Sequence, residues 1–178
     1  PALTPITTDE QWVKDLQGIT LPDAMLAIVR NDPQQEANGY SPKKYLTCRR
    51  SSVLFTHFGF SGPAALDISR TVTLSNDRSS LKLVCDFLPS TGFEDFRSQL
   101  TDDCRGAGRS NVSAIVQDLL PKRLAAAVLD GVGVPAAKKA AELSRQEIRR
   151  LARVIKAAIV PISGTQGFQK AEVTAGGV

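Results

Sequence analysis

The first ninety residues carry short apolar runs separated by polar turns, a pattern typical of β-structure. Strands are predicted at Ala24–Val29, Tyr45–Cys48, Ser52–Phe55, Thr71–Leu74 and Leu81–Phe87. In the last run, apolar and more polar side chains mostly alternate, which indicates a strand with one buried face. Residues 31–44 and 75–80 are rich in turn formers and are predicted to connect neighbouring strands.

From Pro89 onward the spacing of apolar residues becomes helical. Helices are predicted at Phe93–Leu100, Asn111–Leu120, Pro121–Leu129 and Arg145–Ala158, after a short one at Ala64–Arg70. Thr91 stands three residues before Glu94, and Ser144 three residues before Glu147. This is the spacing of a capping box, which satisfies backbone N–H groups at a helix start.

The segment from Arg145 is the most strongly amphipathic part of the chain. Its apolar stripe consists of Ile148, Leu151, Ala152 and Ile155. The opposite face is predicted to carry Arg149, Arg150, Arg153 and Lys156. After it, strand signals return at Ile159–Ile162 and Ala171–Thr174, with a turn at 164–167 between them.

This order of elements predicts an α+β fold. A mainly antiparallel, β-barrel-like subdomain would comprise residues 1–90 and 158–178, and an inserted helical subdomain residues 91–157. With 178 residues, of which 42% are hydrophobic and 22% charged, the chain can bury a core of its own. It shows no membrane-spanning run and no signal peptide, so we expect no membrane partner.

Histidine and cysteine are scarce, which limits the chemistry available. Three cysteines, Cys48, Cys85 and Cys104, and a single histidine, His57, argue against a disulfide framework and most metal sites. We expect no metal, and buried cysteines in a reducing, cytoplasmic compartment. The sequence contains no G-x-G-x-x-G, no phosphate-binding G-x-x-x-x-G-K-[ST] and no G-x-S-x-G.

The net charge of +4 is unevenly distributed. Residues 119–156 hold nine Lys or Arg and three Asp or Glu. Within them, Gly131-Val132-Gly133 resembles the turn of a helix-hairpin-helix motif, followed by Lys138 and Lys139. Such a turn could bind a phosphate through backbone N–H groups. A solvated basic face and an ordinary turn between helices explain the same residues.

The densest local signal is the turn Thr56–Pro63, which links an apolar strand to the short helix. Gly59 and Gly62 allow positive φ or close backbone approach there. His57, with Thr56 and Ser61 nearby, could donate or accept a proton. Alternatively, the imidazole bonds to the backbone and holds the corner.

Two segments together resemble a known family. LFTHFGFSGPAALDISR at Leu54–Arg70 and EVTAGGV at Glu172–Val178 are similar to motifs of the BaiN/YhiN-type flavoproteins. These are NAD(P)/FAD-dependent oxidoreductases that include the aminoacetone-oxidase family. The segments PALTPIT at Pro1–Thr7, Leu16–Leu21 and Ala140–Ser144 support the resemblance.

The resemblance implies that the chain is the inserted domain of such a flavoprotein, excised from its flavin-binding domain. The insert would cap the FAD and substrate site of its parent, with no cofactor bound and no activity in isolation. Its partner would be the flavin-binding domain of the same parent chain, with a small-molecule substrate and no nucleic acid. Thr174, Gly176 and Gly177 would lie against the flavin, and His57, Thr56 and Ser61 would be tentative catalytic groups facing it.

Two other hypotheses remain beside the cap. The chain could be a nucleic-acid-binding module that uses the basic helices and the Gly131-Val132-Gly133 hairpin. It could also be a structural spacer that fixes the two halves of the flavin domain.

Overall fold

The computed structural model describes residues 2–32 and 42–173. The chain divides into two compact units, one formed by Pro1–Pro89 with Ala157–Val178 and the other by Ser90–Lys156. We call them the barrel unit and the helical unit. Helices combined with an antiparallel sheet confirm the α+β prediction.

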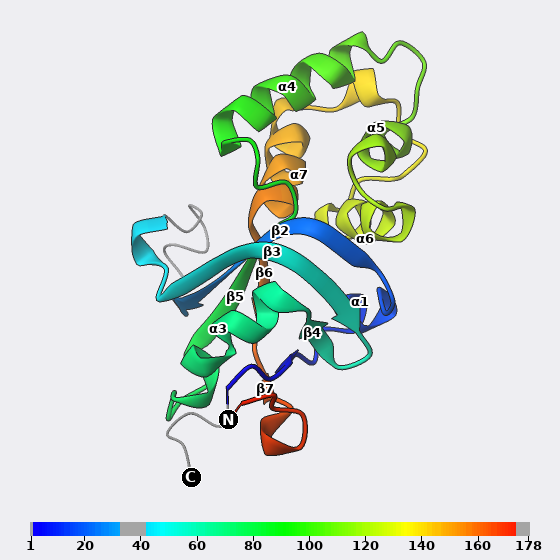
Figure 1. Cartoon of the computed structure of the whole chain (residues 1–178). Helices are drawn as coiled ribbons and strands as arrows, with labels where there is room; N and C mark the ends of the chain where they lie inside the picture. Colours follow the sequence, from blue (N-terminus) through cyan, green and yellow to red (C-terminus); the bar gives the residue numbers. More distant parts are fainter. Residues whose placement is uncertain (1, 33–41, 174–178) are drawn as a thin grey trace. The chain divides into compact units, whose positions relative to one another are not determined.

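The described part of the barrel unit contains seven strands in one antiparallel sheet of order β6-β5-β2-β3-β4-β1-β7 (Figure 1). The strands are β1 (Ile6–Thr7), β2 (Thr20–Arg30), β3 (Thr47–Thr56), β4 (Gly59–Ser61), β5 (Leu81–Asp86), β6 (Ala158–Pro161) and β7 (Gly164–Thr165). The helices are α1 (Gln11–Asp15) and α3 (Pro63–Thr73), with 3₁₀ turns η1 (Pro42–Lys44) and η3 (Gly167–Gln169).

The sheet must curl until its two edges meet. β6 and β7 stand at opposite ends of the strand order, yet only two residues separate them. Three residue steps span at most about 10 Å, whereas a flat seven-stranded sheet would be about 28 Å wide. The connection can only be made if the sheet is rolled up, and the bond from Ser163 N–H to the Thr7 carbonyl (2.9 Å) lies at this closure.

Aromatic side chains fill the interior of the barrel unit. Phe55 and Phe60 are fully buried, with ring centroids 5.3 Å apart, and Phe87 lies 6.4 Å from Phe55. Helix α3 packs against β3 and β2 with a buried face that includes Ile68 and Val72. These contacts hold the β3–β4 hairpin in a rigid setting.

Two strand predictions in the barrel unit are wrong in detail. Thr71–Leu74 is not a strand, because α3 continues to Thr73 and buries Val72. Tyr45–Cys48 and Ser52–Phe55 are not separate strands, because β3 runs unbroken through the polar residues between them. At the other end of the unit, Val173 forms only an isolated antiparallel bridge with Ala2.

The helical unit contains α4 (Phe93–Gly106), α5 (Val112–Leu119), α6 (Lys122–Val132), the 3₁₀ turn η2 (Ala140–Glu142) and α7 (Arg145–Ala157, whose last residue belongs to the barrel unit). The capping box at the start of α7 is confirmed. Ser144 Oγ accepts from the N–H of Glu147 (3.2 Å), and Glu147 Oε2 accepts from the N–H of Ser144 (2.8 Å). The predicted apolar stripe of α7 is buried.

Two predictions in this part of the chain are wrong. Thr91 does not cap α4, since Gly92 occupies the cap position and no side chain bonds there. Lys156 is not on an exposed basic face, because it is buried at 7% exposure. Among the described residues, no helix is long and apolar enough to cross a membrane.

Candidate functional site

The β3–β4 hairpin carries all three tentative catalytic residues at one end of the barrel unit. Thr56 is the last residue of β3, His57 begins the turn, and Ser61 ends β4 opposite Leu54. Thr56 Oγ1 donates to the carbonyl of Gly59 (3.0 Å) and accepts from its N–H (3.1 Å). The Thr56 hydroxyl therefore closes the turn, and its proton is already engaged.

Gly59 is required by the way this turn meets strand β1. Its φ is +144°, and a Cβ there would collide with the backbone carbonyl oxygen of Ile6. Gly62, with φ +85°, caps α3 where the hairpin leads into the helix. The predicted need for positive φ is confirmed at both glycines, and the turn is fixed by backbone packing.

His57 lies exposed in the turn and makes no hydrogen bond with any described residue. Its ring meets that of Phe58 edge-on, with centroids 4.9 Å apart. The alternative in which an imidazole nitrogen bonds to the backbone and holds the corner does not occur among the described residues. As far as the described residues go, both ring nitrogens are open to another molecule.

Ser61 shares a sheet face with Thr56, two pairs along the hairpin. The register pairs Thr56 with Gly59, Phe55 with Phe60 and Leu54 with Ser61. Because side chains alternate between faces, Ser61 and Thr56 point away from the buried Phe55–Phe60 pair. The Ser61 hydroxyl is half-buried and has no partner among the described residues.

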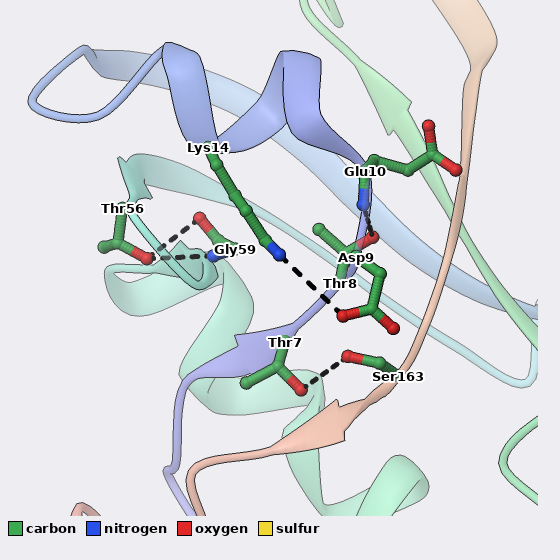
Figure 2. Close-up of polar contacts among 8 residues, drawn as sticks. All are labelled: Thr7, Thr8, Asp9, Glu10, Lys14, Thr56, Gly59 and Ser163. Atoms are coloured by element: carbon green, nitrogen blue, oxygen red, sulfur yellow. Dashed lines mark hydrogen bonds and ion pairs between the residues drawn. The ribbon is translucent and has the colours of Figure 1, made fainter.

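A polar strip runs beside this hairpin along the closure of the barrel (Figure 2). The N–H of Thr8 donates to the Phe58 carbonyl (3.0 Å), and Ser163 Oγ donates to Thr7 Oγ1 (3.0 Å). Lys14 on α1 reaches Asp9, with 3.8 Å between Nζ and Oδ1. We use the name closure edge for His57 and Phe58 together with the strip residues Thr7, Thr8, Asp9, Lys14 and Ser163.

Sequence reasoning missed the strip, for a physical reason. Thr7 and Ser163 are 156 residues apart, and neither stands in a motif that predicts the other. The local signal that could have been used is Thr8, whose Oγ1 accepts from the N–H of Glu10 (3.2 Å) just before α1. Hydroxyls, an ammonium and an imidazole at one edge could orient a polar ring and exchange a proton with it.

The expected flavin contacts Thr174, Gly176 and Gly177 lie outside the described residues. The chain reaches them directly after Val173, which pairs with Ala2. Among the described residues the closure edge offers side chains that could contact a flavin ring. It offers no glycine-rich strand-to-helix turn of the type that holds the diphosphate of FAD.

The Gly131-Val132-Gly133 segment does not form the hairpin between two adjoining helices that the sequence suggested. Gly131 lies inside α6, Gly133 ends that helix with φ +68°, and α7 begins only at Arg145. Lys138 Nζ donates to Glu147 Oε1 (2.7 Å). Lys139 Nζ donates to a backbone carbonyl and to Asn111 Oδ1 (2.8 Å). Both lysines therefore stabilise the fold of the helical unit.

A cleft of about 430 Å³ lies between α4 and α5. Its charged lining consists of Asp102, Asp103 and Asp118. No three His, Cys, Asp or Glu side chains of the described residues are arranged to hold a metal ion. The cleft is therefore acidic, but the described carboxylates in it are not arranged to bind a metal ion.

The three cysteines are free thiols in two different settings. Cys85 and Cys104 are buried, as predicted, and burial raises the pKa of both thiols, with smaller contributions from neighbouring aspartates. Cys48 is exposed, contrary to the prediction.

Two comparisons relate the chain to known proteins. The family model described as "HI0933-like protein barrel and H2TH domain" matches residues 1–173. A Haemophilus influenzae protein named "Ribosomal RNA dihydrouridine synthase" is 28% identical over 182 residues, covering 99% of this chain and 38% of that protein. The chain thus spans well under half the length of this curated relative.

Proposed function

Because the chain belongs to the family of HI0933-like barrel and H2TH domains, which is flavoprotein-related, we propose that it caps the active site of a flavin-dependent enzyme acting on ribosomal RNA. The barrel unit would cover the flavin and the reacting base. FAD would be held by a flavin-binding domain of the same parent chain, in a cytoplasmic enzyme.

The pairing of the two ends of the barrel unit supports a cap that is inserted in a longer protein. The N–H of Ala2 donates to the Val173 carbonyl (2.8 Å), and the N–H of Val173 donates to the Ala2 carbonyl (3.4 Å). A domain whose entry and exit segments lie side by side can be inserted into another domain without disturbing it. The Haemophilus influenzae relative is longer than this chain, which is compatible with such an insertion.

The name of the relative suggests the reaction class. Dihydrouridine differs from uridine by one hydride and one proton added across the C5–C6 double bond. Reduced flavin supplies hydride chemistry when bound. What the cap must add is exclusion of water, orientation of the uracil ring and a group that moves the proton.

His57 is our candidate for that group. Its imidazole, exposed on the hairpin and without a hydrogen bond to the described part of the chain, is the observation that carries the proposal. An imidazole can carry a proton on either ring nitrogen, so it can act as the donor in a proton transfer. Ser61, whose hydroxyl has no partner in the described ranges 2–32 and 42–173, would orient the ring of the base. The Thr56 hydroxyl would keep its structural task of closing the turn.

The test uses the full-length parent gene in its own host. Deletion should remove dihydrouridine from the ribosomal RNA, measured by mass spectrometry of RNA nucleosides, and the wild-type gene should restore it. A parent carrying His57→Gln should bind flavin normally while its turnover falls about 100-fold or more. The matched control is Lys43→Gln, an exposed residue of η1, which should restore dihydrouridine fully.

Two results would contradict the proposal. Unchanged dihydrouridine after gene deletion would remove ribosomal RNA as the substrate. Full activity of the His57→Gln parent would remove His57 from proton transfer and leave the barrel as a spacer between flavin-domain segments.

A further inference from the structure

Some cations of the helical unit have a partner within it: Arg97 pairs with Glu94 (2.6 Å), and Lys138 and Lys139 have the partners described above. Others are exposed and make no ion pair with any described residue, among them Arg105, Arg109 and Lys122. Three of these exposed cations, Arg145, Arg149 and Arg150, lie within six residues of each other on α7.

Helix geometry places these three arginines on the solvent side of α7. At about 100° per residue, Arg149 lies some 40° around the helix from Arg145, and about 6 Å further along its axis. Arg150 lies about 140° around the helix from Arg145, and the buried stripe that begins at Ile148 runs along the remaining side, about 60° from Arg145. Glu147, the one acid on α7, points away from Arg145 and is bonded to Lys138 and Ser144.

An exposed cluster of like charges repels itself and contributes nothing to the stability of an isolated helix. Its arginines are planar donors suited to phosphate oxygens. The spacing of about 6 Å between Arg145 and Arg149 lets these two side chains contact successive phosphates of a nucleic-acid strand, while Arg150 reaches out further around the helix. The arrangement is electrostatically complementary to a polyanion.

We propose that α7 presents Arg145, Arg149 and Arg150 to the phosphate backbone of structured RNA. This inference rests on the proposed function for its choice of RNA. The contacts are made by side chains on a helix surface, not by the Gly131–Gly133 turn. They supply affinity and register, while selection of the base would belong to the closure edge.

The test measures binding of a fluorescein-labelled RNA hairpin to the full chain by anisotropy over a range of salt concentrations. In the triple variant R145Q/R149Q/R150Q, affinity at low salt should fall at least about tenfold, and the slope of log K against log salt should decrease by about 2. The variant R145K/R149K/R150K keeps the charges and should stay within about threefold of wild type.

A charge-matched control separates local contacts from net charge. K43Q/K44Q/K170Q removes three exposed cations from the barrel unit and should change affinity less than about twofold. Circular dichroism of each variant should match wild type, since no buried contact is altered.

Three outcomes would overturn the inference. If R145Q/R149Q/R150Q and K43Q/K44Q/K170Q weaken RNA binding equally, only the net charge of the chain matters. Unchanged binding and slope in the α7 triple would place RNA elsewhere or nowhere. Equal binding of duplex DNA through the same arginines would remove the assignment to RNA. Because this assay does not involve catalysis, a positive result together with unchanged ribosomal dihydrouridine after gene deletion would refute the proposed enzyme while keeping the surface.

Discussion

Glu147 joins the turn after α6 to the start of α7, and its removal should destabilise the helical unit in a pH-dependent way. Its carboxylate accepts from Lys138 Nζ (2.7 Å) and from the N–H of Ser144 (2.8 Å), and its side chain is 16% exposed. These bonds lower the pKa of Glu147 from 4.5 to about 2, and the bond from Lys138 has the largest effect.

The magnitude follows from this shift in pKa. A difference of that size between the folded and unfolded states corresponds to at most about 3 kcal/mol. Solvent near the carboxylate reduces this value to about 1–2 kcal/mol. Because the folded pKa is the lower one, the contribution is complete above the unfolded pKa of 4.5 and is lost as the pH falls toward 2.

The measurement is urea unfolding of wild type and Glu147→Gln, followed by circular dichroism at 222 nm at pH 7 and pH 3. The variant should be less stable by about 1–2 kcal/mol at pH 7, and the difference should shrink clearly at pH 3. Glu142→Gln, an exposed residue of η2, is the control and should stay within about 0.5 kcal/mol at both values. A difference for Glu147→Gln that is the same at pH 7 and pH 3 would refute the argument.

Two further predictions concern backbone sterics and thiol accessibility. Gly59→Ala should lower the stability of the chain by about 3 kcal/mol or more, because its Cβ would meet the Ile6 carbonyl. Gly131→Ala has open space around it in α6 and should raise the stability by about 0.5–1 kcal/mol. Thermal unfolding of the two variants measures these effects, and equal effects would contradict the assigned roles. Ellman's reagent should modify Cys48 promptly in the native chain and the two buried cysteines only after unfolding; three fast thiols would show that the barrel and helical cores open readily.

The local chemistry of the sequence predicted the class of fold and most element positions. Apolar periodicity marked α7, and the Ser144–Glu147 spacing marked its start, because both signals act within one or two turns of chain. The two strands predicted at Tyr45–Cys48 and Ser52–Phe55 leave out Arg49 and Arg50 between them. In the structure the strand continues through both, and each has an acidic partner on its own face of the sheet: Arg50 bonds Asp23 (2.6 Å) and Arg49 bonds Asp67 (2.8 Å).

Tertiary packing decided the elements that the sequence misassigned. The β-branched residues of Thr71–Leu74 favour a strand locally, but burial of Val72 on α3 extends the helix. The closure of the barrel was also beyond local signals, because it depends on Thr7 meeting Ser163 across almost the whole chain. The sequence therefore predicted the hairpin, which is half of the candidate site. It did not predict the polar strip beside the hairpin.

The geometry of the hairpin distinguishes a structural role from a catalytic role for its polar residues, which the sequence alone could not do. A side chain that acts on another molecule must be held in place while its own polar atoms stay out of the hydrogen bonds that stabilise the fold. In the hairpin, the Thr56 hydroxyl and the backbone of Gly59 bond to each other and close the turn, whereas the His57 imidazole makes no hydrogen bond to a residue that the structure describes. On the proposed function, Gly59→Ala should therefore lower stability and activity together, whereas His57→Gln should lower activity alone.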